Sequence, residues 1–406
     1  MRISILLPYK ENFSINKSGA VSLGVNDILK NTSKKNDTFV FGKTEEKKFL
    51  DKNYINLKFK KIFLKSHSKI YIKKFLEYER KKPSDIIEVH NRPAYIEQIK
   101  KYASSKLILY FHNDPLTMSG SKTIKDRRLL LSKVDHFIFN SKWSLERFKI
   151  GLNDFNYYKN NFSVVYQSVN KPKINFNKKK NVISFIGKLN RAKGYDVFGG
   201  SIIKILNKYK DWKAIVIGDE PREKISFQHK RLINYGYKDH KFILKKLENT
   251  SISVICSRWN EPLGRASLEA CSRGSVPIIT NRGGLPETSK SALIIKHLNT
   301  KKLFTAIETL ILDKKKLRKL QYDNYKNFNF TPNLIAKKIE LIRETLIPVR
   351  KFNIINQNTK IKILHITNFN ERYNGRLHYN TGRRLNNGFV RNNHTVFTLS
   401  DRDIIH

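Results

Sequence analysis

The sequence predicts an α/β fold with two parallel-sheet domains in tandem. Short runs rich in Ile, Val and Phe alternate with helical stretches, and these runs are apolar at successive positions. Strands that are apolar on both faces are typical of parallel sheets covered by helices on both sides. Residues 170–181, NKPKINFNKKKN, interrupt this alternation and have no periodicity. We therefore expect a linker there, between a first domain at 1–169 and a second domain at 182–347.

The first domain opens with a strand and a helix, and further strands follow. The helix is expected from about Ala20 to Lys30, after the first strand. The predicted strands are ISILLP (3–8), TFVFG (38–42), IIEVH (86–90), KLILYFH (106–112), HFIFN (136–140) and SVVYQS (163–168).

The second domain repeats this pattern after the linker. Its predicted strands are VISFIG (182–187), WKAIVIG (212–218), ISVICS (252–257), VPIIT (276–280) and ALIIK (292–296). Helices are expected from about Tyr195 and after Pro262. Lysine-rich helices from about Lys301 to Ile347 are expected to close this domain.

The segment 351–406 shows a third strand, glycine-bearing loop, helix and strand. Its first strand KIKILHIT, its helix through Leu385 and Phe389 and its last strand HTVFTLS resemble the opening of the chain. We expect the truncated start of a further α/β domain. A C-terminal extension packed on the preceding domain is the alternative.

The chain is strongly basic, with 80 Lys and Arg against 34 Asp and Glu and a formal net charge of +46. A generally lysine-rich composition is one explanation. The functional alternatives are attraction to nucleic acid or to an anionic membrane surface. The sequence has no paired Cys and His, no aromatic run of the RNA-binding type and no heptad-linked basic helix, so a nucleic-acid-binding protein is disfavoured.

Cysteine usage and the N-terminal residues bear on the compartment. Cys256 and Cys271 lie in apolar surroundings at a spacing that fits neither a metal site nor a disulfide framework. We expect buried thiols in a reducing cytoplasm. The apolar run before Pro8 is too short for a signal peptide or a transmembrane helix. A cytoplasmic protein follows, peripheral at most on the inner face of the cytoplasmic membrane.

Ligands of doubly wound sheets bind beyond the carboxyl ends of the strands, so the loops there are the first candidates for a site. The loop GKLNRAKG (187–194) places Lys188 and Lys193 before a helix, and two cations suit a diphosphate. The loop NRGGLPE places Gly283 and Gly284 where a close backbone approach is possible, followed by Glu287. Each loop alone also has an ordinary structural interpretation, as a chance lysine pair or a glycine turn.

The stretch NEPLGRASLE places two glutamates around the start of a helix expected from about Gly264 to Arg273. The free amides and the dipole at the start of a helix suit a diphosphate. Glu269 lies roughly 7 Å along the helix axis at 1.5 Å per residue, which suits a ribose beside that phosphate. Glu261 stays on the loop, where a sugar would lie. A capping or solvated carboxylate is the alternative for each glutamate.

Together, E-P-L-G-x-x-x-x-E at 261–269, G-K-x-x-x-x-K-G at 187–194 and G-G-L-P-E at 283–287 resemble the retaining glycosyltransferases of family 4, the glycosyl transferases group 1. The resemblance covers about residues 1–347. It implies a GT-B fold, with two Rossmann-like domains that face each other across a cleft. It also implies transfer of a sugar from a UDP- or GDP-sugar to a glycan or glycolipid, in lipopolysaccharide or polysaccharide synthesis of the cell envelope.

The resemblance also implies roles for residues of the second domain. Lys188, where the family more often has arginine, and Lys193 would neutralise the diphosphate. Glu261 would bond hydroxyls of the transferred sugar, and Glu269 would bond those of the ribose. Arg265, where the family often has an apolar residue, would add a phosphate contact. The implied donor-binding residues are Gly19, Gly187, Lys188, Lys193, Glu261, Leu263, Gly264, Arg265 and Glu269.

In the first domain, the resemblance assigns the acceptor side and part of the reaction. Ser18 and Gly19 stand at a helix start, like the family's glycine loop. His112 ends the strand KLILYFH, like the family's histidine beside the reacting sugar, and is implied to be catalytic together with Lys193 and Glu261. His90 in EVHNRP is a second candidate, and with Ser18 and Arg92 it would bind the acceptor, which Arg92 suits if the acceptor is anionic.

The implied mechanism is electrostatic. Lysines and helix amides would stabilise the charge on the leaving nucleoside diphosphate. Attack of the acceptor from the same face would give retention. A sugar-nucleotide epimerase or a phosphorylase of the same fold is the alternative. No cofactor or metal is required, and we interpret the pair Asp401 and Asp403 in SDRD as a chance match to a metal-binding D-x-D.

Overall fold

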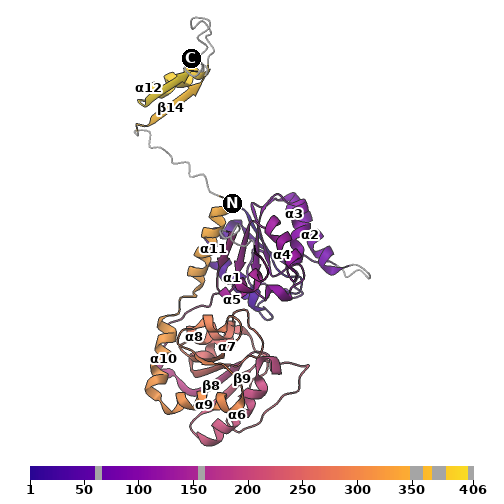
Figure 1. Cartoon of the computed structure of the whole chain (residues 1–406), viewed down its shortest axis with the longest axis vertical. Helices are drawn as coiled ribbons and strands as arrows, with labels where there is room; N and C mark the ends of the chain where they lie inside the picture. Colours follow the sequence, from indigo (N-terminus) through magenta and orange to yellow (C-terminus); the bar gives the residue numbers. More distant parts are fainter. Residues whose placement is uncertain (60–65, 154–160, 348–359, 368–380, 401–406) are drawn as a thin grey trace. The chain divides into compact units, whose positions relative to one another are not determined.

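The computed structural model describes residues 1–59, 66–153, 161–347, 360–367 and 381–400. The chain divides into two compact units, Met1–Pro348 and Val349–His406. The first unit contains two parallel sheets, each flanked by helices (Figure 1). The predicted pair of parallel-sheet, Rossmann-like α/β domains is therefore confirmed.

The first sheet has seven strands in the described part of the chain, in the order β3-β2-β1-β4-β5-β6-β7. All of its pairings are parallel. The strands are β1 (Ile3–Leu6), β2 (Thr38–Gly42), β3 (Tyr54–Asn56), β4 (Ile86–His90), β5 (Lys106–Phe111), β6 (His136–Phe139) and β7 (Phe162–Val164). All six predicted strands are present, and only the three-residue β3 was not predicted.

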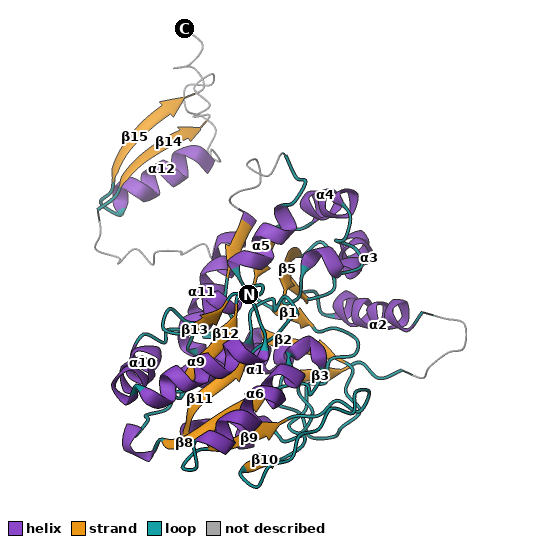
Figure 2. Cartoon of the chain, turned by 60° about the horizontal axis from the view of Figure 1, so that its bottom comes forward, coloured by secondary structure: helices purple, strands orange, loops and turns teal. Residues whose placement is uncertain are grey.

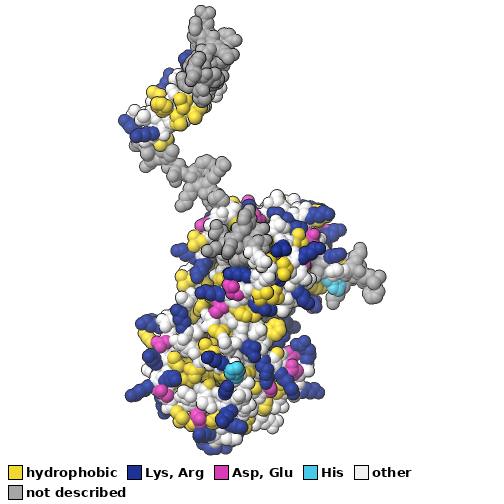
Figure 3. Space-filling model, in the orientation of Figure 1, with side chains coloured by type: hydrophobic (Ala, Val, Ile, Leu, Met, Phe, Trp, Pro, Cys, Tyr) yellow, Lys and Arg dark blue, Asp and Glu magenta, His cyan; other side chains and the backbone are white. Residues whose placement is uncertain are grey.

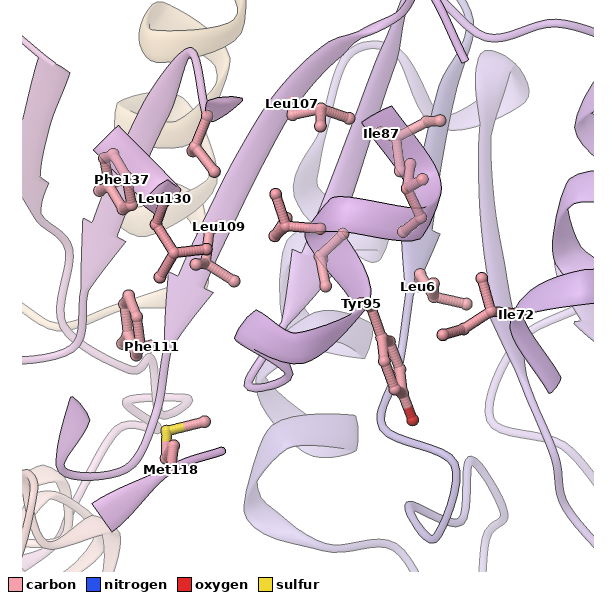
Figure 4. Close-up of a cluster of buried hydrophobic side chains, with 14 of the residues drawn as sticks. Leu6, Ile72, Ile87, Tyr95, Leu107, Leu109, Phe111, Met118, Leu130 and Phe137 are labelled. Atoms are coloured by element: carbon pink, nitrogen blue, oxygen red, sulfur yellow. The ribbon is translucent and has the colours of Figure 1, made fainter. Parts of the chain in front are cut away.

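Helices cover both faces of this sheet because each strand alternates its side chains between two apolar clusters. Ile87 belongs to the cluster with Leu6 and Tyr95 (Figure 4), whereas Ile86 belongs to the opposite cluster with Ile3. The helices of this half are α1 (Ala20–Asn31), α2 (His67–Lys81), α3 (Ile96–Tyr102), α4 (Ile124–Lys133), α5 (Lys142–Lys149) and α11 (Pro332–Leu346).

The position of α11 differs from the sequence-based expectation. The helices up to Ile347 were expected to close the second domain, but α11 packs on α1 of the first half (Figure 1). Ile335 and Ile339 of α11 are buried in the same cluster as Ile3. The spacing of apolar residues shows which face of a helix is buried, but it does not show against which sheet.

The second sheet has six strands in the described residues, in the order β10-β9-β8-β11-β12-β13. The strands are β8 (Lys180–Ile186), β9 (Lys213–Ile217), β10 (Leu232–Asn234), β11 (Thr250–Ile255), β12 (Val276–Thr280) and β13 (Leu293–Ile295). The helices are α6 (Tyr195–Lys208), α7 (His240–Glu248), α8 (Arg265–Ser272), α9 (Thr300–Leu312) and α10 (Lys314–Lys326). The three-residue β10 was not predicted, and β8 begins two residues before the predicted strand start at Val182.

The second unit contains one strand, one helix and one parallel strand in its described residues. These are β14 (Lys362–Thr367), α12 (Thr381–Arg391) and β15 (Thr395–Ser400), with the helix along one side of the strand pair (Figure 2). The predicted order of strand, helix and strand is confirmed. Asp401 and Asp403 lie outside the described residues. Leu364 and Phe397 are 59% and 67% exposed, so one face of the strand pair is not covered within this unit.

A buried ion pair ties α11 to the first sheet. Arg343 donates from Nε to Glu88 Oε1 at 2.6 Å and from Nη2 to Glu88 Oε2 at 2.9 Å. Arg343→Met leaves the carboxylate without its partner, and we expect the free energy of unfolding to fall by about 3–5 kcal/mol. Urea denaturation measures this loss. The control is Arg258→Met, which removes an exposed bridge to Asp196 and should cost less than about 1 kcal/mol. Equal losses in the two variants would contradict this role of the pair.

Candidate functional site

A cavity of about 280 Å³ lies between the carboxyl ends of the two sheets. This position follows from the topology, because parallel strands of one sheet end at the same edge. Both halves of the first unit line the cavity. The first half contributes Ala20, Val21, His112, Asn113, Asn140 and Gln167, and the second half contributes Phe185, Ile186, Gly187, Lys193, Val254, Ile255, Ser257, Glu261, Pro262, Leu263, Gly264, Arg265 and Ala266.

The start of α8 reaches this cavity through two interlocked loops. Gly264 precedes the helix with φ +103°, and a Cβ there would lie 2.3 Å from Leu285 Cδ2. Gly283 has φ +64°, and a Cβ there would lie 2.0 Å from the carbonyl oxygen of Glu261. Gly284 N donates to that same oxygen at 2.7 Å. The glycines of both motifs therefore allow the loops to touch, which fixes Glu261 at the start of α8.

Lys193 stands opposite this helix start. Its Nζ donates to Glu261 Oε1, and both side chains line the cavity. The turn that carries Lys193 is fixed at both ends: Asn190 accepts from Lys193 N at 3.0 Å, and Gly194 follows with φ +74°. Cys256 Sγ packs under the turn, 3.3 Å from Gly194 O. The Lys193 ammonium is thus held near the N-terminus of α8. A bound anion there would contact both the ammonium and the free amides of the helix.

Cys256 and Cys271 are buried free thiols, as the sequence predicts. Burial raises the pKa of each thiol to about 12. Both thiols are therefore protonated at neutral pH and are poor nucleophiles. Their contribution is to packing, which in the case of Cys256 supports the turn of Lys193.

Glu269 is buried and already paired. Its Oε1 accepts from Arg265 Nε at 2.9 Å and lies 2.7 Å from His240 Nε2. Burial raises the pKa of Glu269, but His240 and Arg265 outweigh it and hold the pKa below its usual value. Arg265 Nη2 also lies 3.7 Å from Asp27 Oδ2 on α1. A ribose at Glu269 would therefore meet an ionised carboxylate that Arg265 connects to the first half.

His112 brings the first sheet to the cavity. Its ring stacks on Tyr110 with the ring centroids 4.2 Å apart, and its Nε2 lies 2.9 Å from His90 Nδ1. Its Nδ1 lies 3.4 Å from Gln167 Nε2. Burial lowers the pKa of His112 well below its ordinary value, and the neighbouring His90 lowers it further. His112 is therefore neutral at pH 7.

A carboxylate of the chain itself lies at the start of α1, where the resemblance implies a donor contact of Gly19 and an acceptor contact of Ser18. Glu11 Oε1 accepts from Ser22 N at 3.0 Å, in the first turn of α1. A Cβ on Gly19 would lie 2.5 Å from this oxygen. Burial raises the pKa of Glu11. Gly19 and Ser18 do not line the cavity, although Ala20 directly after them does.

The third motif joins the two halves. Glu287 accepts from the amides of Lys142 and Trp143 at 2.8 Å each, and from Tyr166 Oη at 2.9 Å. Lys142 begins α5, so a carboxylate of the second half caps a helix of the first. Glu287 is bound in this contact rather than directed at a ligand.

The structure thus brings part of the predicted site together around one cavity and places the other predicted residues outside its lining. The predicted residues that line the cavity are His112, Gly187, Lys193, Glu261, Leu263, Gly264 and Arg265. Lys188 is exposed and does not line it, whereas Glu269 and His90 each lie one contact behind a lining residue. Arg92 lines a second cavity of about 970 Å³, which shares Asn113 with the first.

Several residues of the site were not predicted. Asn140 and Gln167 line the cavity, and Asp27, His240 and Glu11 contact predicted residues. Only Asn140 and Gln167 carry a sequence signal, since both stand at the carboxyl ends of predicted strands. The other three lie in helices or loops, where position along the chain does not indicate proximity.

Neither a metal nor a membrane span has structural support in the described ranges. Within them, no group of three or more His, Cys, Asp and Glu side chains could hold a metal ion. No helix among the same residues is long and apolar enough to cross a membrane.

Comparisons with known proteins agree with this geometry. Residues 167–327 match the family described as Glycosyl transferases group 1. The putative glycosyltransferase YtcC of Bacillus subtilis is 27% identical over 302 residues, 65% of this chain and 73% of YtcC. The fold matches Anabaena HepE, solved with UDP-glucose, with a TM-score of 0.68 at 16% identity over 85% of this chain and all of that one. It also matches WaaG, with a TM-score of 0.61 at 11% identity over 85% and 100%.

The comparisons extend what the fold alone shows. Two parallel-sheet domains with these structural neighbours confirm the predicted GT-B fold. The chain carries a glycosyl transferases group 1 domain, and it is a glycosyltransferase.

Proposed function

We propose that this glycosyltransferase moves a hexosyl or related sugar from a UDP- or GDP-sugar to a glycan or glycolipid, with retention, in cell-envelope lipopolysaccharide or polysaccharide synthesis. One observation carries the proposal. The Lys193 ammonium, the Glu261 carboxylate and the start of α8 meet His112 of the opposite sheet in a single cavity. Cation, helix amides and hydroxyl-binding groups are what a nucleotide sugar requires.

The diphosphate is assigned to Lys193 and to the start of α8. A helix start offers free amides and the positive end of the dipole, and an ammonium adds a full charge. Both would stabilise the charge that grows on the leaving diphosphate. In the ligand-free chain Lys193 is bonded to Glu261. A bound donor would contact both groups, with its phosphate at the Lys193 ammonium and its sugar hydroxyls at the Glu261 carboxylate.

The nucleoside is assigned to Glu269. This carboxylate is kept ionised by Arg265 and His240, so it is a strong acceptor for ribose hydroxyls. Arg265 Nη1 is buried without a hydrogen-bond partner among the described residues. Arg265 lines the cavity, so an Nη1 without a partner supports the proposed phosphate contact of this side chain.

The acceptor is assigned to the 970 Å³ cavity of the first half. Arg92, Lys69 and Lys101 line it together with Tyr95 and Tyr102. Cations beside aromatic rings suit a glycan that carries an anionic group. WaaG, a structural neighbour, is described as a glycosyltransferase involved in lipopolysaccharide biosynthesis, which supports the envelope assignment.

We also propose that the protein works in the cytoplasm, on the inner face of the cytoplasmic membrane, where an anionic surface would attract it. The support is the charge of +46, with Lys and Arg side chains spread over the visible face of the first unit (Figure 3). Each basic residue near an anionic surface contributes about 1 kcal/mol at most. A lipid-linked acceptor would be met there.

Residues 351–406 are proposed to be part of a further α/β domain rather than a packed extension. The support is the parallel pairing of β14 and β15 with exposed apolar side chains, since parallel sheets are covered on both faces. Titration of the isolated segment with the dye ANS tests this: strong binding is expected from an uncovered sheet, and no binding would contradict it.

Product analysis separates the proposed reaction from its alternatives. The chain is incubated with a panel of UDP- and GDP-sugars, with and without envelope glycolipids, and the products are identified by mass spectrometry. We expect a glycosylated acceptor only when donor and acceptor are both present. Conversion of the donor alone would indicate an epimerase, and release of a sugar phosphate in the presence of phosphate would indicate a phosphorylase. Faster transfer to acceptors in anionic than in neutral vesicles is expected if the membrane surface contributes.

A further inference from the structure

Three polar side chains form a row on one face of the first sheet. Glu88 and His90 alternate along β4 with Ile87 and Val89, which belong to the opposite apolar cluster. His112 follows β5 two residues after Tyr110, which pairs with His90. All three of these polar side chains are at least 93% buried. Burial of polar groups is costly unless each finds a partner, so their order is informative.

The contacts form a chain from α11 to the cavity. Arg343 of α11 holds both oxygens of Glu88, at 2.6 and 2.9 Å. Glu88 Oε2 lies 3.7 Å from His90 Nε2, and His90 Nδ1 lies 2.9 Å from His112 Nε2. Burial raises the pKa of Glu88, but Arg343 and His90 lower it to about 2, so the carboxylate is ionised.

The order of these contacts determines which ring nitrogen of His90 and of His112 carries the proton. An ionised carboxylate 3.7 Å away favours a proton on His90 Nε2 over a lone pair there. When His90 carries one proton, on Nε2, its Nδ1 is the acceptor. It must receive its hydrogen bond from His112 Nε2–H, which leaves the lone pair of neutral His112 on Nδ1.

We infer that Glu88 and His90 are positioning residues that hold His112 with its proton on Nε2, so that Nδ1 is offered to the cavity as a hydrogen-bond acceptor for a substrate hydroxyl. The neighbour of Nδ1 is consistent with this tautomer. Gln167, which also lines the cavity, lies with Nε2 3.4 Å from Nδ1 and can donate to it, and a bound substrate hydroxyl would take the place of this donor. The inference rests on the proposed function, since it takes the group opposite Nδ1 to be a sugar or acceptor hydroxyl.

Two other charged groups lie near the row. Glu11 on the loop after β1 and Arg92 after β4 interact electrostatically with each other, and Glu11 also interacts with His90. Their charges are opposite, so neither reverses the preference that Glu88 imposes on His90.

The tautomer is read directly in the wild-type chain. The 11 histidines are labelled with ¹⁵N, and long-range proton–nitrogen NMR spectra distinguish Nδ1–H from Nε2–H rings. The signal of His112 is assigned as the one lost in His112→Asn. We expect neutral His112 with its proton on Nε2 at pH 7. A proton on Nδ1, or on both nitrogens, would overturn the inference, whether or not sugar transfer is intact.

Variants of His90 connect the tautomer to the reaction. His90→Leu removes the acceptor for His112 Nε2–H, and we expect mixed tautomers and a fall of about tenfold or more in kcat/KM. His90→Asn can keep an acceptor oxygen at the position of Nδ1, so it should retain the tautomer and most of the activity. His136→Asn is the matched control. His136 is a buried histidine at the other edge of the sheet, with Nε2 2.9 Å from Ser163 Oγ, and both readouts should stay unchanged.

The outcomes separate the inference from the proposed function. An unchanged His112 tautomer in folded His90→Leu would overturn the inference. The expected tautomer in a chain that transfers no sugar would uphold the assignment of Glu88 and His90 and would overturn the proposed function instead.

Discussion

Replacement of Lys193 by alanine is expected to lower kcat for sugar transfer by about 10²- to 10³-fold. The leaving diphosphate gains charge as the bond to the sugar breaks, and the Lys193 side chain lines the cavity together with the start of α8. Its stabilisation is larger in the transition state than in the bound donor, so KM should change much less than kcat. Steady-state kinetics with a saturating acceptor measures both.

Two further lysines sharpen this prediction. Lys204 is exposed on α6 behind the same loop, and Lys204→Ala should leave kcat unchanged. Lys188→Ala tests the role that the motif implies for this lysine against the position that the structure gives it. The motif resemblance implies a phosphate contact for Lys188, but the side chain is exposed and outside the cavity lining, so we expect a much smaller loss than for Lys193. Equal losses at both lysines would mean that the loop rearranges when the donor binds.

Glu269→Ala is expected to weaken binding of the donor by about 100-fold, equal to about 2.7 kcal/mol. An ionised carboxylate that bonds ribose hydroxyls contributes about 1.5–3 kcal/mol, and its removal also frees Arg265 from its position beside the diphosphate. Isothermal titration with UDP and GDP measures the loss.

The controls for Glu269 account for its burial. The alanine variant leaves Arg265 and His240 without their shared partner, so Glu269→Gln, which keeps the shape, is measured beside it. Glu308→Ala removes a carboxylate of the same half that accepts from Lys208, the last residue of α6, and from Tyr209 directly after it. Neither residue lines the cavity. The affinity of this variant for nucleotide should match the wild type. Unchanged affinity in folded Glu269→Ala would remove the ribose assignment.

The sequence predicts the sheets well because short runs rich in Ile, Val and Phe mark buried parallel strands. Strands β2, β4 and β12 begin and end where the runs do. The strands β3 and β10 each have only two adjacent apolar residues before an asparagine, which is too few to stand out as an apolar run. The position of α11 depends on long-range contacts with Ile3 and Glu88, which no local pattern contains.

The candidate site was predictable only where motif and strand end coincide. Lys193, Glu261, Gly264 and His112 were predicted on that basis, and all four line one cavity. Glu287 has the same kind of position, but it caps α5 of the other half instead. The motifs show which functional groups stand at a strand end. The packing of the two halves then determines which of these groups are used in contacts within the chain and which can bind a ligand.

The row behind His112 was visible in the sequence but was not recognised. Glu88 and His90 stand two positions apart in the otherwise apolar strand IIEVH, and this spacing puts both on one face. Their partners could not be predicted, because Arg343 lies 255 positions from Glu88 in the chain.

The most direct test of the proposed reaction is its stoichiometry. A donor labelled with ¹⁴C in the sugar and ³²P in the diphosphate is incubated with the chain and an envelope glycolipid. We predict that the acceptor gains ¹⁴C without ³²P, in a one-to-one ratio with the nucleoside diphosphate released. Release of nucleoside diphosphate without a ¹⁴C-labelled acceptor, or an acceptor that carries both labels, would contradict sugar transfer at this site.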